Sequence, residues 1–337
     1  MLVIGASIIF LILLFIPFIP GVIELRRPRD ATPLFIDMEH TKDPRYFGKS
    51  FRSVMNKYVQ SYPLRQGIRD IPLSQREEVL ISGSCSVPAG RQVNHILCIA
   101  GDLTSEGNVY FQKEIYATGD VVTGSSNVLK AIASDGRIRL DSHTRVLRWV
   151  DADQEIEVGE GSHLGISLSC GGELRIAQGC TFQRLFGFPI LTGFTDHPDI
   201  HKNHAPEHEI SGGQDSPRNI STIPRGSVME KDLIVKNDLR IEDNCLISGN
   251  IKTYSGLVIG AHVTVNGNIF SEEDITIGEH AVIDGNIFSQ GRVIIQGNAQ
   301  IGKKGQMKSI IGKSGVDLGP NICVYGYIMT EAAGMTR

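Results

Sequence analysis

The chain has 337 residues, of which 41% are hydrophobic and 21% charged, with a formal net charge of −4. This near-neutral balance gives no whole-chain basic field, so nucleic acid is not an expected partner. Six cysteines without a CxxC pair argue against a disulfide-stapled secreted domain and against a zinc ribbon. The 37 glycines and single tryptophan favour many short strands and tight turns over a helical bundle.

The chain begins with an apolar segment, and no side chain from Met1 to Ile23 is charged. Since about 20 helical residues cross a bilayer core, we expect a transmembrane anchor over residues 1–24. A cleaved signal peptide is the alternative, but no basic residue precedes the apolar run and no small-x-small site follows it. Arg26, Arg27 and Arg29 form the membrane flank after the segment. The positive-inside bias therefore predicts a single-pass membrane protein with the bulk of the chain on the cytoplasmic side.

Residues 25–78 are interpreted as a juxtamembrane or capping segment. Phe47, Phe51, Met55 and Tyr58 lie at helical spacing and predict a short amphipathic helix. We favour a helix that covers the first rung of the repeats that follow, where backbone and apolar side chains need protection. A helix lying on anionic lipid is the alternative.

An 18-residue repeat is the strongest signal in the chain. Four gapless windows begin at Leu239, Leu257, Ile275 and Val293, and a fifth begins at Val316 after five extra residues. Apolar or small residues fall at window positions 1, 3, 7 and 9, and usually at 13. The solenoid core is therefore expected to contain Leu257, Ile259, Val263, Val265, Ile269, Ile275, Ile277, Ile283 and Ile287.

This spacing predicts a parallel β-solenoid. A step of two keeps side chains on one face of a strand, and a step of four turns a corner, so each repeat completes three sides. Gly249, Gly267, Gly285 and Gly326 recur at one corner, where a residue without Cβ can adopt a positive φ. The expected fold class is an all-β parallel β-helix of 18-residue rungs, preceded by one transmembrane helix and a short helical segment.

Two repeat arrays are expected. The first spans residues 79–187, where Gly83, Gly101 and Gly119 lie 18 apart and a one-residue slip falls near residues 134–136. A linker rich in His and Pro follows over residues 188–225. The second array spans residues 226–330, and a tail of seven residues, 331–337, ends the chain.

The sequence offers little catalytic chemistry. In the linker, His197, His201, His204 and His208 are spaced as metal ligands on a helix could be, but prolines interrupt any such helix and we favour a solvated loop. His262 and His280 share window position 6 and are expected on the surface. We expect no catalytic residue, no metal and no cofactor.

The stretch ITIGEHAVIDGNIFSQGRVIIQGNAQIG, residues 275–302, resembles the bactofilin family of polymer-forming bacterial cytoskeletal proteins. The resemblance rests on this alternation and on the GNI turns, and covers residues 233–329 well and 79–186 more loosely. It implies a right-handed β-helix that assembles end to end into nucleotide-independent filaments, often along the membrane, without catalytic residues. The chain departs from the family pattern by its second array and its apolar start.

The last rung is the expected surface for assembly, because the short tail can cover little of its open end. Its inward residues are Val316, Leu318, Ile322, Val324 and Ile328. We therefore hypothesise a membrane-anchored, non-catalytic scaffold that forms a homopolymer by end-to-end contacts. Its expected partners are itself, the membrane, and cell-envelope or division proteins.

Two alternatives stay open. Hexapeptide acyltransferases also have 18-residue coils, and Ile259-Gly260 and Ile277-Gly278 fit their repeat unit. However, Thr253, Ser271 and Ser289 stand where those enzymes usually keep an aliphatic residue, and no catalytic histidine is evident. A membrane-bound platform that recruits partners without polymerising is the other alternative.

Overall fold

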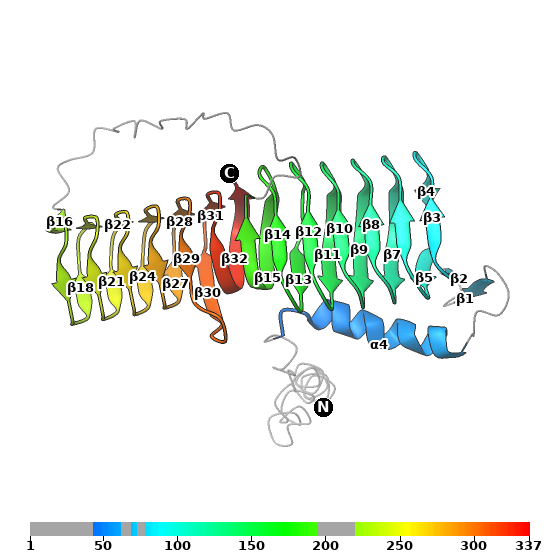
Figure 1. Ribbon diagram of the computed structural model, residues 1–337, viewed down its shortest axis with the longest axis horizontal. Coiled ribbons are helices and arrows are strands. Elements are labelled where there is room, and N and C mark those ends of the chain that lie inside the picture. The colour runs from blue at the N-terminus through cyan, green and yellow to red at the C-terminus, as the bar shows by residue number, and fades with distance from the viewer. Residues whose placement is uncertain (1–42, 62–68, 73–77, 194–219) are drawn as a thin grey trace, which may run out of the picture. The chain divides into compact units, whose positions relative to one another are not determined.

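The computed structural model describes residues 43–61, 69–72, 78–193 and 220–337. The described residues from Pro44 onward belong to one compact unit, in which the strands wind into a parallel β-solenoid with an apolar interior (Figure 1). The all-β solenoid predicted from the 18-residue period is confirmed. Within the described residues, α4 (Tyr46–Ser61) is the only helix.

Three faces run along the solenoid, each built from one strand per rung. The helix face contains β2 (Glu78–Ser82), β5 (Ile96–Ile99), β7 (Tyr110–Ala117), β9 (Val128–Ser134), β11 (Arg145–Ala152), β13 (Ser167–Cys170) and β15 (Thr181–Thr192), then β18 (Leu233–Val235), β21 (Ile251–Thr253), β24 (Ile269–Ser271), β27 (Ile287–Ser289) and β30 (Lys308–Gly312). The second face contains β3 (Cys85–Val87), β6 (Leu103–Ser105), β8 (Val121–Thr123), β10 (Ile138–Leu140), β12 (Ile156–Val158) and β14 (Leu174–Ile176), then β17 (Val228–Met229), β20 (Leu246–Ile247), β23 (Thr264–Val265), β26 (Val282–Ile283) and β29 (Gln300–Ile301). The third face contains β4 (Gln92–Val93) and the first parts of β7, β9, β11 and β15, then β16 (Ser221–Ile223), β19 (Leu239–Ile241), β22 (Leu257–Ile259), β25 (Ile275–Ile277), β28 (Arg292–Ile295) and β31 (Gly315–Leu318). The last strand, β32 (Cys323–Thr336), passes through all three faces.

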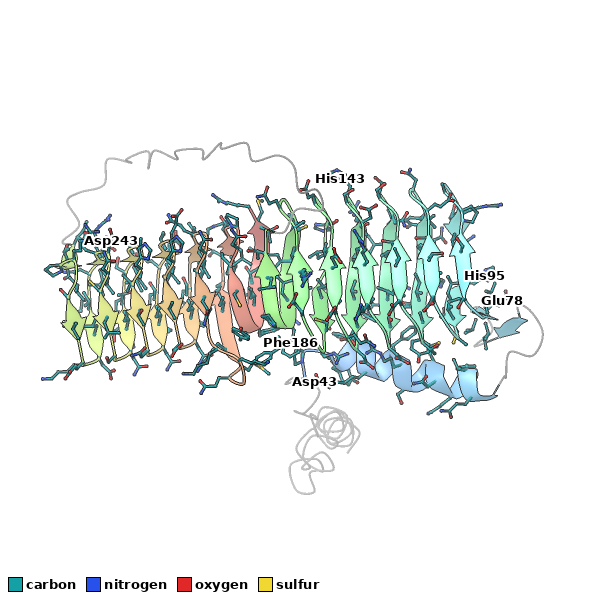
Figure 2. The ribbon with its side chains drawn as sticks, viewed as in Figure 1. Asp43, Glu78, His95, His143, Phe186 and Asp243 are labelled. Atoms are coloured by element: carbon teal, nitrogen blue, oxygen red, sulfur yellow. The ribbon has the colours of Figure 1, made fainter. Side chains whose placement is uncertain are left out.

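The second array follows the repeat in register. Leu257 pairs with Ile275 and Ile275 with Val293, each partner lying one repeat further along the chain. Val293 pairs with Val316, because the five extra residues lie between β29 and β30, where Lys303 and Gln306 form an antiparallel bridge. The nine side chains assigned to the core are at most 1% exposed. Aliphatic side chains thus stack rung on rung, and Figure 2 shows them filling the interior.

The first array is less regular, as its weaker repeat indicates. The strand β9 lacks one residue relative to both neighbours: Phe111 pairs with Leu129, but Glu114 pairs with Ala131. The short corner therefore lies at residues 129–131, a few residues before the position expected from the glycine spacing. From there on Val121 pairs with Ile138, which accounts for the one-residue slip.

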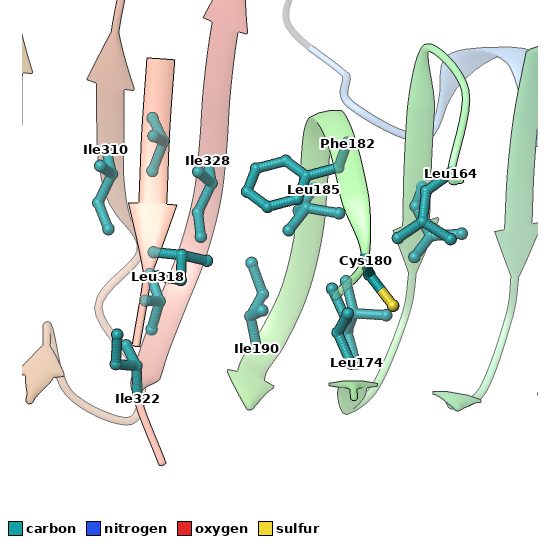
Figure 3. Close-up of a cluster of buried hydrophobic side chains, with 14 of the residues drawn as sticks. Leu164, Leu174, Cys180, Phe182, Leu185, Ile190, Ile310, Leu318, Ile322 and Ile328 are labelled. Atoms are coloured by element: carbon teal, nitrogen blue, oxygen red, sulfur yellow. The ribbon is translucent and has the colours of Figure 1, made fainter. Parts of the chain in front are cut away.

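The two arrays join through their last rungs. The strand β15 pairs antiparallel with β32, placing Leu185 opposite Ile328 and Ile190 opposite Val324. Figure 3 shows the two sets of aliphatic side chains facing each other across this junction. One core therefore continues from the first array into the second, although their chain directions are opposed.

The element boundaries differ from those expected. The strand β15 reaches Thr192 inside the expected linker, and β16 begins at Ser221. Residues 331–336, expected in a tail, complete the last rung, since Gly334 pairs with both Val316 and Phe182.

The predicted amphipathic helix is present, and it covers more than the first rung. The helix α4 lies along the helix face, mainly over β7, β9 and β11, and its Met55 also belongs to one buried cluster with Val79 and Ile81 of the first rung. Met55 is buried, while Phe47 is 49% exposed. At the first rung, β1 (Arg69–Pro72) pairs antiparallel with β2 and so covers the edge of that strand.

The expected membrane-spanning helix requires a correction. No helix of the described ranges has the length and apolar character to cross a bilayer, α4 having only 16 residues. The expected anchor over residues 1–24 and its flank of Arg26, Arg27 and Arg29 lie outside the described residues. For the part of the chain that the structure describes, the fold class is therefore corrected to a β-solenoid with one short helix, and the single-pass membrane location is not supported.

Candidate functional site

The described residues leave the first rung of the second array uncovered. Its strands β16, β17 and β18 each pair, among the described residues, with one strand of the next rung only. The inward side chains of this rung are Ile223, Met229, Leu233 and Val235, and all four are partly exposed, whereas their counterparts in the next rung are buried. We call these four residues the open end. It presents a slice of apolar core beside backbone groups that have no strand partner within the described chain.

The surface that the sequence analysis assigned to assembly lies at the opposite end of the array. Val316, Leu318, Ile322, Val324 and Ile328 are all 0% exposed. They pack against the first array across the β15–β32 junction, so this rung is covered within the same chain. The apolar last rung of the second array does form an end-to-end contact, but it contacts the first array of the same chain and not a second copy. No pattern in the sequence indicates it, because the two last rungs are unrelated in sequence and lie far apart in the chain.

Most of the corner glycines are required by close packing between rungs, and not by the positive φ that was expected for them. Gly249, Gly267 and Gly285 are absent from the positive-φ residues, and a Cβ on Gly267 would overlap the carbonyl oxygen of Gly249. Among these four glycines, only Gly326 combines close packing with a positive φ, 143°. Stacked glycines therefore let successive turns approach one another.

The left-handed backbone occurs at another corner, occupied mainly by Asn and His. His262 and His280 both have φ 56°, and Asn298 has φ 60°. The two imidazole rings stack with centroids 4.8 Å apart. They lie on the surface at consecutive rungs, as expected, and their rings stack on one another.

The hydroxyl side chains that depart from the acyltransferase pattern are buried. The Thr253 hydroxyl donates to Ser271 Oγ at 3.0 Å, and Ser271 Oγ donates to the Ser255 carbonyl at 2.6 Å. Ser289 repeats this bond to the Glu273 carbonyl. These hydroxyls satisfy backbone carbonyls at the corner where the chain leaves the helix face, a structural use of polar groups inside the core.

A buried ionic cluster holds α4 on the helix face. The Arg52 guanidinium pairs with Asp151 and donates to the Ser134 carbonyl, and Arg45 donates to both oxygens of Asp151. Burial opposes the charge on Arg45, but its bonds to Asp151 and Asp153 outweigh burial and raise the Arg45 pKa. Gly48 permits the close approach, since a Cβ there would overlap Asp151.

A tyrosine completes this cluster. Tyr116 donates to Asp135 Oδ2 at 2.7 Å and contacts Asn56 Oδ1 at 2.5 Å. Burial, reinforced by the bond to Asp135, raises the Tyr116 pKa well above its usual range. The arrangement is a docking site for α4, with every buried side-chain polar atom of the described residues hydrogen bonded.

The described residues contain no group of three or more His, Cys, Asp or Glu that could hold a metal ion. His197, His201, His204 and His208 lie outside them. The cysteines are free, and burial raises the pKa of Cys98 to about 11 and that of Cys170 to about 12.

A depression on the second face is lined by Arg139, Glu157 and Arg175, whose charges alternate from rung to rung. Such a ladder of opposite charges is typical of strand pairing.

Comparison of the chain with protein-family models, with curated proteins and with solved structures found no match.

Proposed function

We propose that this protein is a structural scaffold that self-associates through the open end of its second array, in the manner that the bactofilin resemblance implies. The observation that carries the proposal is the exposure of Ile223, Met229, Leu233 and Val235 on a rung whose outer edge has no strand partner within the described chain. Unpaired strand edges template the addition of another strand, and a slice of apolar core gains free energy when covered.

The regularity of the second array supports a structural role. A solenoid rung contacts only its neighbours, so the same packing that joins rungs inside the chain can join rungs of two chains. The β15–β32 junction provides an example within the molecule, because two solenoid ends pair there without a shared sequence. We infer that the open end uses the same physics between copies, and that the scaffold acts without nucleotide or catalysis.

The acyltransferase alternative receives less support. Its coils depend on aliphatic residues where this chain buries Thr253, Ser271 and Ser289, and these hydroxyls bond the corners of the solenoid. Recruitment of partners without polymerisation is the third hypothesis, and it predicts a monomeric chain.

The test is negative-stain electron microscopy and sedimentation of the full-length chain, without nucleotide or added metal. We expect filaments or discrete end-to-end oligomers. Leu233→Lys, which places a charge in the open end, should abolish them, whereas Val258→Lys, on the outward side of the third face, should leave them intact. A monodisperse monomer, or equal assembly of both variants, would contradict the proposal. Trimers with acetyl-CoA binding would favour the acyltransferase.

A further inference from the structure

The helix face continues without interruption across the junction. Ser169 pairs with Phe186, and Phe186 pairs with Tyr327 of β32, so the sheet that carries α4 in the first array extends into the second. Figure 2 places Phe186 at the middle of the molecule. The helix α4 packs mainly on β7, β9 and β11 of this layer, and no described element covers its continuation in the second array.

One outward row of this continuation is apolar and bounded by two cations. Successive pairings align, in order along the solenoid, Lys252, Phe270, Phe288, Ile311, Met329 and Arg184. We call these six residues the aromatic strip. The Phe270 and Phe288 rings stack with centroids 5.2 Å apart, and the four apolar side chains are partly exposed.

The two ends of the aromatic strip carry positive charge. Lys252 Nζ lies 4.7 Å from the centroid of the Tyr254 ring and 5.4 Å from that of the Phe270 ring, so the ammonium group contacts both rings at the end of the aromatic row. Arg184 is exposed at the other end, beside the junction. Within the described part of the chain, neither cation forms an ion pair with a carboxylate. The strip thus offers an apolar centre and two available positive ends.

The first array shows what kind of element this layer accommodates. There, α4 packs Phe51 edge-on against Trp149, at 5.6 Å between ring centroids, and its arginines pair with Asp151 on the sheet. In the aromatic strip the charges are reversed, because the cations lie on the sheet and a docked helix would supply the carboxylates. Its length also fits: five steps between strands at about 4.8 Å span about 24 Å, the length of a helix of about 16 residues. The helix α4 itself has 16 residues.

We propose that the aromatic strip binds an amphipathic helix of a partner protein, one with an apolar face and acidic residues near both ends. The continuity of the strip with the α4 interface and the charge complementarity at Lys252 and Arg184 support this occupant. The apolar face of the helix covers the phenylalanines, and its carboxylates pair with the two cations. Binding to this side face is compatible with assembly through the open end, so the scaffold recruits a partner along its length.

The test uses the full-length chain and two fluorescein-labelled synthetic peptides of the same length as α4. Both carry leucines on one helical face; one has glutamates at both ends and the other has lysines. Fluorescence anisotropy should show at least tenfold tighter binding of the glutamate peptide. Phe288→Asp should weaken that binding at least tenfold, whereas Val258→Asp, on the third face, should not change it.

A charge reversal tests whether weaker peptide binding by Phe288→Asp is due only to loss of folding. The double variant Lys252→Glu, Arg184→Glu changes only surface charges and should reverse the preference, so that the lysine peptide binds more tightly. Equal binding of the two peptides, or an unchanged preference in the double variant, would overturn the proposal. If Phe288→Asp altered only the sedimentation of the chain and not peptide binding, the strip would be an interface between copies, and the proposal would likewise fail.

Discussion

Thr192 and Thr336 make the same pair of hydrogen bonds across the junction, each from one array to the other. The Thr192 hydroxyl donates to the Gly319 carbonyl at 2.7 Å and accepts from the Ile322 amide at 3.1 Å. The Thr336 hydroxyl donates to the Ala177 carbonyl at 2.7 Å and accepts from the Cys180 amide at 3.0 Å. Each threonine therefore closes a turn in the opposite array, and the two ends are fixed by reciprocal contacts.

We expect Thr336→Val to destabilise the junction. The valine keeps the shape but removes the hydroxyl, leaving the Ala177 carbonyl and the Cys180 amide without this partner in a buried site. An unsatisfied buried group costs about 1–3 kcal/mol, so the urea unfolding midpoint should fall accordingly. Thr222→Val, at an exposed position on the open rung, should change the midpoint little. Equal midpoints for the two variants would show that the reciprocal bonds do not hold the arrays together.

Ile283→Asp should unfold the second array. Ile283 is 0% exposed and pairs with Val265 and Ile301 in the stacked core, so an aspartate there would bury an unpaired carboxylate. We expect a loss of several kcal/mol. Val282→Asp is the matched control, because the neighbouring side chain points outward. Circular dichroism and solubility should separate the two, and an intact Ile283→Asp protein would show that the rung is assembled differently.

The repeat made the second array predictable from sequence, while the junction was not. Leu257, Ile275 and Val293 recur once per repeat because each must fill the same position in successive rungs, so the register follows from the spacing. The pairing of Leu185 with Ile328 has no such signal. This pairing joins the last rungs of the two arrays, and each of these rungs occurs only once in the chain, so no repeat in the sequence identifies the partner. Any apolar rung of matching shape would fit the same end.

The position of α4 shows a similar limit. Its helical periodicity identified the apolar side that includes Met55, but periodicity does not specify which surface that side covers. The decisive contacts are those of Arg52 with Asp151, which lies far along the chain, and of Tyr116 with Asn56. Charged residues within a helix are normally interpreted as solvated, and here one is buried. The open end could not be predicted either. The sequence shows that the second array has two ends, but not that one of them is covered at the β15–β32 junction.

Gly267→Ala should destabilise the second array despite its conservative appearance. The new Cβ would overlap the Gly249 carbonyl, a backbone group that cannot move without shifting the preceding rung. Overpacking of this kind costs about 1–3 kcal/mol, and the thermal midpoint should fall. At Gly83 nothing lies within 4 Å of an added Cβ, so Gly83→Ala is the control and should be neutral. A neutral Gly267→Ala would mean that the rungs are spaced more widely at this corner.

Arg52→Ala should release α4 while leaving the solenoid folded. The arginine side chain is 7% exposed and its partner Asp151 1%, so truncation leaves a buried carboxylate that only Arg45 still neutralises. We expect a loss of about 3 kcal/mol, concentrated in the helix. Hydrogen exchange of α4 should accelerate, and the fluorescence of Trp149 should change as Phe51 leaves it. Lys57→Ala, at an exposed position on the same helix, should do neither.

The stability of the chain should fall in alkali through its buried thiols. Burial raises the pKa of Cys170 from 9.0 to about 12, which favours the neutral form in the folded state. A raised pKa contributes stability that is fully present below the unfolded value, and this contribution is lost as pH rises from about 9 toward about 12. Urea midpoints measured at about pH 8 and about pH 10.5 should therefore differ, and Cys170→Ala should reduce the difference. An identical slope in the variant would show that this thiol does not couple folding to pH.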